Sequence, residues 1–551
     1  MTSHTASPES VPPLTLLHTL SHPSSSATRA WQSAPHPDPS IPLLATASAD
    51  KSANIYSLKD FSLVSTISGG HKRSVRTVAW KDFGRQRKGA RRKPVVLGTG
   101  SFDANVGVWV WNDERRRGVL SDDLAEDNSA EDAIETDMTN NDEDAEEWHF
   151  STLLTGPDSE IKSIEFSPPH YPANLLATSS RDKSVWIWEE VEPEEWETIA
   201  VLSEHTGDVK CVGWCTGAQR RRSKRRRVQE DGDVSMGEEG GHLNGARTSN
   251  EVPAEDGQDE DSTVGARPLL ASGSYDDTIR LWRDVEEEGD WICVAVIASH
   301  TGTVWDVKWE PHINYSILDI PNTATEEENT TTMITAFEND WQPRILSCSD
   351  DLSVRVWRRE LSQAEKEKRR QQRQGGSTSL SAPMGFSSSR IPSVIRPMSA
   401  IETWVEDVTL PQVHVRSVYA VDWSKKTGLV VSCGGDGTIA VYREIAAPAT
   451  STSNGREGGD VVMNGTASDS SAPTENGGSE EAEPYKLHTS KWEVVALMEA
   501  AHDEFEINHV CWAERRDKDR RFVGEEMIVS TGDEGDVRIW TLPEELVKEF
   551  E

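Results

Sequence analysis

The chain lacks the sequence features of a secreted or membrane-embedded protein. Its N-terminal stretch, MTSHTASPESVPP, has neither a basic start nor an apolar run, so we expect no signal peptide. No apolar stretch reaches the roughly 20 residues that a membrane-spanning helix needs. We therefore expect a soluble protein of the cytoplasm, with the nucleus as a second location, and no contact with a membrane.

Cysteine is scarce, and its spacing is wrong for a metal site. The sequence has 6 cysteines and no C-x-x-C pair: Cys211, Cys215, Cys293, Cys348, Cys433 and Cys511. Zinc and iron–sulfur sites usually draw on closely spaced cysteines. We expect free thiols in a reducing compartment, no metal site made by this chain alone and no cofactor bound by it.

Positive charge is also in short supply, because the formal net charge is −37. Such a chain repels phosphates unless a local basic patch overcomes the excess, so we expect no direct binding of nucleic acid. One insert carries a strongly basic run, RRRSKRRR, Arg220–Arg227. A solvated basic loop and a nuclear-import signal are both open readings, whereas no aromatic residues interleave to favour nucleic acid.

Tryptophan, in contrast, is plentiful, with 20 Trp against 10 Phe and 7 Tyr, and it marks a repeat. The pattern is a short apolar run, a Ser or Thr, small residues, an acid, and an aromatic residue six positions later. It reads LLATSSRDKSVWIW at Leu175–Trp188 and LLASGSYDDTIRLW at Leu269–Trp282. Seven copies keep the same register, with turn acids at Asp50, Asp103, Asp182, Asp276, Asp351, Asp436 and Glu534.

Each copy predicts two strands joined by a tight polar turn, with one strand before it and one after it. Four antiparallel strands repeated seven times indicate an all-β fold, a seven-bladed WD40 β-propeller. A blade cannot bury both of its faces alone, so the ring must close. The stretch LTLLHTL, Leu14–Leu20, has no copy of its own and is predicted to supply the outer strand of the last blade.

The turn acids lie farther apart than the roughly 40–45 residues of a plain repeat, and polar inserts account for the excess. We expect one propeller over residues 11–545, a disordered stretch at 1–10, and disordered inserts at about 113–147, 218–266, 360–400 and 446–483. The stretches Lys81–Pro94 and Pro311–Pro343 are also expected to be loops.

A polar lock is expected inside the blades. In WD40 repeats the turn Asp accepts a hydrogen bond from a His ahead of the first strand, and the His links to the Ser or Thr and to the strand Trp. Complete sets are His71, Thr99, Asp103 and Trp109; His205, Ser272, Asp276 and Trp282; and His300, Ser347, Asp351 and Trp357. A Ser–His–Asp set that recurs from blade to blade is structural, so we expect no catalysis and no enzyme.

Three blades depart from this pattern. Tyr442 replaces Trp in the sixth blade, and Pro157 stands where the third blade would have its His. The seventh blade has Glu534 for Asp and one extra residue after His502. We expect the third and seventh blades to close differently from the others.

The upper face of the propeller, where the turn acids lie, is the predicted partner-binding face. Two positions per blade are not needed for the core: the residue before the turn acid, and a residue in the first strand. They supply aromatic and basic residues of the types enriched at interface hot spots. The candidates are Arg181, Phe102, Tyr275, Trp305, Arg76, Lys162, Lys210, Tyr419 and Trp31.

Several of these stretches resemble one WD40 family, the cytosolic iron–sulfur protein assembly factor of fungi and animals. The resemblance lies in six stretches that span the ring in matching order, but not in the inserts. They are SRDKSVWIWE (Ser180–Glu189), SYDDTIRLW (Ser274–Trp282), HTGTVWDVKW (His300–Trp309), VHVRSVYAVDW (Val413–Trp423), GDGTIAVYRE (Gly435–Glu444) and EINHVCW (Glu506–Trp512).

The resemblance implies a non-enzymatic scaffold of the cytosolic iron–sulfur assembly (CIA) targeting complex, which delivers 4Fe–4S clusters to cytosolic and nuclear apoproteins. Its implied partners are a small acidic CIA targeting subunit, a HEAT-repeat CIA subunit, a hydrogenase-like iron–sulfur carrier and apo iron–sulfur client proteins. The rival hypotheses are an adaptor of another kind, such as a chromatin or ubiquitin-ligase receptor that uses the basic insert, and an enzyme.

Overall fold

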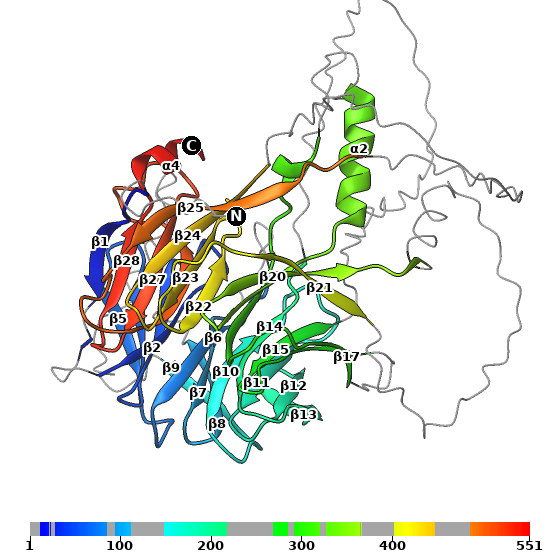
Figure 1. Cartoon of the computed structure of the whole chain (residues 1–551). Coiled ribbons are helices and arrows are strands. Elements are labelled where there is room, and N and C mark those ends of the chain that lie inside the picture. The colour runs from blue at the N-terminus through cyan, green and yellow to red at the C-terminus, as the bar shows by residue number, and fades with distance from the viewer. Residues whose placement is uncertain are drawn as a thin grey trace, which may run out of the picture.

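Seven four-stranded antiparallel sheets make up most of the part of the chain that the structure describes. The computed structural model describes residues 11–20, 22–23, 28–84, 94–111, 148–217, 268–284, 291–319, 327–363, 365, 402–446 and 485–550. The predicted seven-bladed, all-β propeller is confirmed (Figure 1). The residues that we expected to be disordered at 1–10, and most of the expected inserts, lie outside the described residues, as does Arg220–Arg227. Within the described part of the chain, no helix is both long and apolar enough to cross a membrane.

The strands of the first four blades follow one another in chain order. Blade 1 is β2 (Ala30–Pro35), β3 (Leu43–Ser48), β4 (Ala53–Ser57) and β5 (Leu63–Ile67). Blade 2 is β6 (Val75–Trp80), β7 (Val96–Ser101), β8 (Asn105–Trp111) and β9 (Trp148–Thr155). Blade 3 is β10 (Ile161–Phe166), β11 (Leu175–Ser180), β12 (Val185–Glu192) and β13 (Glu195–Leu202). Blade 4 is β14 (Val209–Trp214), β15 (Leu269–Ser274), β16 (Ile279–Asp284) and β17 (Trp291–Ile297).

The last three blades complete the ring. Blade 5 is β18 (Val304–Trp309), β19 (Ile345–Ser349), β20 (Val354–Glu360) and β21 (Thr403–Thr409). Blade 6 is β22 (Val418–Trp423), β23 (Val430–Gly434), β24 (Ile439–Ala446) and β25 (Ser490–Met498). Blade 7 is β26 (Ile507–Glu514), β27 (Glu526–Gly532), β28 (Val537–Thr541) and, from the other end of the chain, β1 (Thr15–Leu20). Figure 1 shows β1 (blue) beside β28 (red), and this antiparallel pair closes the ring.

Apolar side chains fill the spaces between neighbouring blades. One buried cluster joins Leu43 and Ile55 of blade 1 to Val78, Trp80 and Trp109 of blade 2. The second strand of each blade is buried along nearly its whole length, since a neighbouring blade covers each of its faces. Burial of this kind is the main term that holds a propeller together, at about 25 cal/mol per Å² of apolar surface removed from water.

Polar side chains add a second link between blades. The first strands of adjacent blades lie next to each other around the central axis. At six of the seven junctions, a first-strand side chain accepts a hydrogen bond from a backbone N–H of the following blade. The acceptors are Gln32 (from Val78, 3.1 Å), Thr77 (Ile164, 3.2 Å), Glu165 (Trp214, 2.9 Å), Asp306 (Val421, 3.2 Å), Asp422 (Trp512, 2.7 Å) and His509 (Ser33, 3.5 Å).

The direction of the strands places the connections on two different faces. The first and third strands of a blade run from the upper face toward the lower face, and the second and fourth run back, because neighbours are antiparallel. Connections within a blade that lie at the lower face are therefore first-to-second and third-to-fourth. Every undescribed segment between two strands of one blade leaves and re-enters there: 85–93, 112–147, 218–267, 285–290, 320–326, 366–401 and 447–484.

One expected loop is ordered, which corrects the sequence analysis. The stretch Pro311–Pro343 contains the 3-10 helix η3 (Tyr315–Ile317) and the helix α2 (Glu327–Asp340), which stands clear of the blades in Figure 1. Ile313, Leu318 and Phe337 form a buried satellite cluster, and Tyr485, which precedes β25, packs against it. The insert holds enough apolar side chains to make a small core of its own, which the reading of this stretch as a polar loop overlooked.

A short helix after the last strand packs on the ring at the lower face. The short helix α4 (Glu544–Lys548) follows β28 and buries Leu546 and Val547 against blades 6 and 7.

Candidate functional site: the upper face

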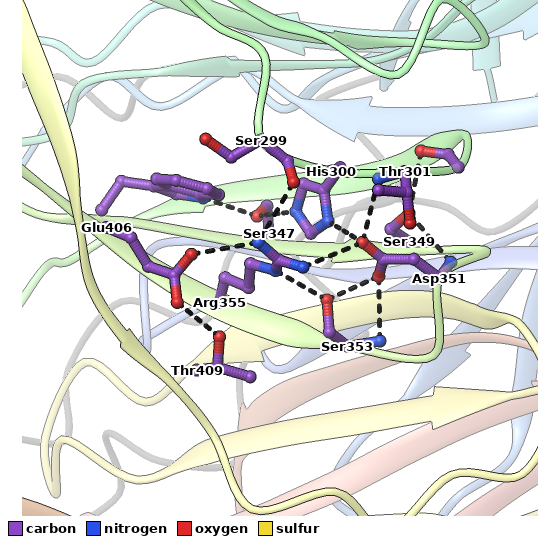
Figure 2. A network of polar contacts seen from close by, with 12 residues as sticks. Ser299, His300, Thr301, Ser347, Ser349, Asp351, Ser353, Arg355, Glu406 and Thr409 are labelled. Carbon is purple, nitrogen blue, oxygen red and sulfur yellow. Dashed lines mark hydrogen bonds and ion pairs between the residues drawn. The ribbon is translucent and has the colours of Figure 1, made fainter.

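The polar locks position the upper face, because they fix the turns at which it is built. In blade 5, His300 Nδ1 lies 2.8 Å from Asp351, and His300 Nε2 lies 2.8 Å from the hydroxyl of Ser347. Figure 2 shows His300 between Asp351 and Ser347. The Trp357 indole donates to the same Ser347 hydroxyl at 2.7 Å. Asp351 also accepts from the backbone N–H of Thr301 at 3.2 Å, which ties the entering chain to the turn.

Blades 2 and 4 repeat this arrangement with their own residues. In blade 2, His71 lies 3.3 Å from Asp103 and 2.8 Å from Thr99, which accepts from Trp109 at 2.9 Å. In blade 4, His205 lies 2.9 Å from Asp276 and 2.8 Å from Ser272, which accepts from Trp282 at 2.8 Å.

The electrostatics of the lock suit a structural role. Burial lowers the pKa of His205, against the opposing pull of Asp276, and so favours the neutral imidazole. Burial alone would raise the pKa of Asp276, but hydrogen bonds from His205 and Thr278 outweigh it and hold that pKa well below its usual range. The result is a buried acceptor that stays ionised and fully hydrogen-bonded, not a poised general base.

Blade 3, which lacks the His, is built around a second tryptophan. Asp182 accepts from the backbone N–H of Asp158 at 2.8 Å and of Ser184 at 2.9 Å. The Trp186 indole donates to the Ser184 hydroxyl at 2.9 Å and stacks on Trp188 with the ring centroids 5.5 Å apart. No imidazole is involved, so this blade closes differently, as the sequence predicts.

Blade 7, in contrast, closes like the others, and the expectation that it would differ is wrong. His502 pairs with Glu534 and lies 2.7 Å from Ser530, which accepts from Trp540 at 2.8 Å. The extra methylene of Glu534 lets its carboxylate reach the imidazole. Strained turn residues, Ala500 (φ 50°) and Asp503 (φ 57°), accommodate the longer connection.

Blade 1 has a His–Asp contact that the sequence analysis missed, although the His contacts the hydroxyl two positions before the turn acid, whereas the lock hydroxyl of the other blades lies four positions before it. His22, which follows the closing strand β1, lies 3.0 Å from the Ser48 hydroxyl and 3.2 Å from Asp50. The signal was hidden by spacing, since eight positions separate His22 from Ala30, whereas four separate His205 from Val209.

The predicted face residues lie around the central axis in two contact chains. In the first, Trp31 packs edge-on against Phe102 with centroids 5.8 Å apart, and Lys162 lies over the Phe102 ring at 4.8 Å. Arg76 lies over the Trp31 ring at 5.2 Å. In the second chain, Lys210 lies between Tyr275 (5.5 Å) and Trp305 (5.0 Å). Trp305 then packs against Tyr419 at 5.3 Å.

Arg181 stands apart from these chains and is the most open of the cations among the predicted face residues. Its side chain is 57% exposed, and its guanidinium lies 3.7 Å from the Glu160 carboxylate. Tyr275 is 63% exposed, whereas the other seven predicted residues are half-buried. Exposed Arg and Tyr above a half-buried aromatic and cationic layer are the composition of an interface centre.

The cysteines show no sign of a metal centre. Among the described residues, no three His, Cys, Asp or Glu side chains are grouped so as to hold a metal ion. Five of the six cysteines are buried. Burial raises the pKa of Cys211, Cys348 and Cys433 well above the usual thiol value, so the thiolate form that binds metal is disfavoured there.

Comparison with known proteins agrees with this architecture. The family model for the WD domain, G-beta repeat, matches residues 148–189, 261–283 and 408–443. An Aspergillus flavus protein named probable cytosolic iron-sulfur protein assembly protein 1 is 41% identical over 544 residues, covering 96% of this chain and 98% of the relative. Proteins of the same name from Neurospora crassa and Botryotinia fuckeliana are each 34% identical, over 93% and 96% of this chain and 92% and 98% of their own.

The chain belongs to this family. The resemblance seen in the sequence is therefore confirmed, and the relatives match the chain over nearly its whole length. The family name speaks of cytosolic iron–sulfur protein assembly and of no catalysed reaction. WD40 propellers are typically interaction scaffolds without catalysis.

Proposed function

We propose that the protein is a non-enzymatic scaffold of the cytosolic iron–sulfur assembly targeting complex, which helps to insert 4Fe–4S clusters into cytosolic and nuclear apoproteins. The observation that carries the proposal is the full-length match to assembly proteins of that name. A propeller whose buried His and Asp residues are engaged in hydrogen bonds of their own blades supports a binding role better than a catalytic one.

The partners follow from the family resemblance. They are the small acidic targeting subunit, the HEAT-repeat subunit, the hydrogenase-like iron–sulfur carrier and the apo client proteins. In this proposal the clusters stay with the partner proteins, and the propeller holds the partners in place. The nine aromatic and basic residues of the upper face are the proposed contact surface.

Affinity purification of the tagged full-length chain from fungal cells, with quantitative mass spectrometry, tests the proposal. We expect the assembly subunits to be enriched over a control strain, and we expect the Arg181→Glu variant to recover less of at least one of them. The matched control is Lys518→Glu, which makes the same change of charge at an exposed position between β26 and β27 on the lower face. Purification without any iron–sulfur assembly subunit would overturn the proposal.

A further inference from the structure

The charged residues of the upper face are segregated between its two halves. Blades 2 to 4 carry the cationic arc, which consists of Arg73, Arg76, Lys162, Arg181 and Lys210. Blades 5 to 7 carry the acidic arc, which consists of Asp350, Glu506 and Asp533. Two cations lie beside it: Arg29, which pairs with Asp533 at 2.9 Å, and Arg416, which donates to the Gly435 carbonyl oxygen. The two arcs face each other across the central axis, because they occupy corresponding positions on opposite blades of one ring.

The cationic arc holds more positive charge than its own carboxylates can balance. Glu160 serves three of the cations: Lys162 at 2.7 Å, Arg73 at 3.2 Å and Arg181 at 3.7 Å. Asp208 serves Lys210 at 3.4 Å. Among the described residues, Arg76 has no carboxylate within ion-pair distance, and its guanidinium instead lies over the Trp31 ring and near the Trp31 carbonyl oxygen at 3.4 Å.

These cations also repel one another at close quarters. Burial lowers the pKa of Lys162, and the neighbouring charges of Lys210 and Arg76 act in the same direction, although Glu160 opposes them. Burial lowers the pKa of Arg76 to about 10. The Lys162 and Lys210 side chains are only 16% and 12% exposed, so water solvates and screens their positive charges poorly. An anion from outside would relieve this repulsion.

Aromatic rings hold the lysines in place for such an anion. Phe102 lies beneath Lys162, and the Tyr275 and Trp305 rings flank Lys210. These contacts orient the ammonium groups without neutralising them, because a ring offers a quadrupole and not a charge. The surroundings are therefore preorganised for carboxylate groups, which can accept two or more charge-assisted hydrogen bonds.

The acidic arc limits what kind of anion can bind. Asp350 accepts from the Trp305 indole at 2.6 Å, and Glu506 accepts from the Tyr419 hydroxyl at 3.2 Å, so both carboxylates are fixed at the face. A nucleic acid strand, which is uniformly negative, would be repelled as it passed over these residues. A protein segment can be acidic at one end and neutral or basic at the other.

We propose that the upper face binds an extended segment of a partner protein in one direction, with its carboxylates over Arg76, Lys162 and Lys210 and its neutral or basic end over the acidic arc. This inference rests on the proposed function only in taking the upper face as the contact surface. It adds the chemistry of the docking element and the direction in which that element lies.

The test uses a fluorescein-labelled probe peptide with four glutamates at one end, a Gly-Ser spacer and two lysines at the other. A second peptide has glutamine in place of each glutamate, and a third has serine in place of each lysine. Binding to the purified full-length chain is measured by fluorescence anisotropy at low and high salt. We expect the first peptide to bind at least about tenfold more tightly than the glutamine peptide, and to weaken at high salt.

Variants then locate the charges. Lys162→Met and Lys210→Met keep the aliphatic stems over the rings but remove the charge, and each should weaken the first peptide by about tenfold. Asp350→Asn keeps an acceptor for Trp305, and it should weaken the lysine-bearing peptide but not its serine counterpart. Lys518→Glu, on the lower face, should change nothing. Each variant is checked for an unchanged thermal midpoint, and a variant that fails this check is replaced by Arg76→Gln.

Equal binding of the glutamate and glutamine peptides would overturn the inference. So would tighter binding of a twelve-residue oligothymidylate than of the first peptide, which would assign the face to nucleic acid. Loss of direction, seen as an Asp350→Asn effect on both lysine and serine peptides, would also refute it. If these peptides fail while assembly subunits still copurify in an Arg181-dependent way, only this inference falls. If the peptides behave as expected but no assembly subunit copurifies, the proposed function falls instead.

Discussion

Arg181 and Asp182 are neighbours in the chain, yet the structure gives them opposite roles, and substitution can separate these roles. The Arg181 side chain is 57% exposed, and its guanidinium lies 3.7 Å from the Glu160 carboxylate. Exposed ion pairs of this kind contribute about 0–1 kcal/mol to stability. Arg181→Glu should therefore leave the thermal midpoint almost unchanged while it weakens partner capture.

Asp182→Ala should do the reverse. The Asp182 carboxylate accepts from the backbone N–H groups of Asp158 and Ser184, at 2.8 Å and 2.9 Å, and also from the Ser184 hydroxyl. Hydrogen bonds to a charged group contribute about 1.5–3 kcal/mol each in buried settings, and this site is only half-buried. We expect the free energy of unfolding to fall by about 2–4 kcal/mol, with a midpoint lower by several degrees.

Differential scanning fluorimetry of both variants, together with copurification of the assembly subunits, measures the two effects. The Lys518→Glu variant controls for the change in net charge. A fall in midpoint for Arg181→Glu as large as that for Asp182→Ala would show that Arg181 supports the fold. Undiminished capture of every assembly subunit by Arg181→Glu would remove this residue from the contact surface.

Three further substitutions test the interior of the ring by thermal or chemical unfolding. Ser347→Ala leaves the His300 imidazole and the Trp357 indole without the hydroxyl that both contact, and it should cost about 2–4 kcal/mol. Ser347→Thr should cost little, because Thr occupies this position in blade 2, and equal losses would contradict the lock. Burial raises the pKa of Glu165 to about 7, above the roughly 4.3 of an unfolded chain, so its contribution to stability is fully present below about pH 4 and is lost by the time the pH has risen through 7. Glu165→Gln should therefore gain stability relative to the native chain as the pH rises from about 4 to 7, with little further change above, and a pH-independent difference would refute this. Gly156→Ala places a methyl group 2.6 Å from the Trp186 ring and should cost about 1–3 kcal/mol, and an unchanged unfolding midpoint would show that the ring moves aside freely.

The ring could be predicted from the sequence because its determinants are local and repeat. The turn acid, the Ser or Thr four positions before it and the aromatic six positions after it lie in one hairpin, so their spacing is fixed by strand geometry. Tyr442 illustrates the tolerance of the pattern, since its hydroxyl lies 3.3 Å from Ser432, the same hydroxyl that His414 contacts at 2.7 Å.

The remaining features depend on contacts between distant segments, which spacing does not reveal. His22 reaches Ser48 and Asp50 of blade 1 from the far end of a long connection. Glu534 reaches His502 because its longer side chain compensates for the longer loop. In the sequence these two changes look like two separate departures from the repeat pattern. The helix α2 packs on a small core that also includes Tyr485, which lies between the third and fourth strands of the next blade.

The candidate face could be predicted as a set of positions but not as an electrostatic pattern. The positions follow from the repeat, and they do lie together around the axis. The ion pairs of these residues could not be predicted from the repeat, because Glu160 and Asp208 lie outside the two positions considered. These two carboxylates determine how much positive charge on the face remains unbalanced.

The placement of the long connections at the lower face has a practical consequence for building reporters. A fluorescent protein spliced between Ala446 and Tyr485 would leave and rejoin the ring on the side away from the aromatic and basic surface. The fluorescent protein would then mark the location of the propeller and leave the upper face accessible to partners. The same insertion between Gly156 and Ile161 would interrupt a turn that Asp182 holds. Insertions are therefore expected to be tolerated at the lower face, whereas insertions at the upper face would disturb the turns that build the proposed contact surface.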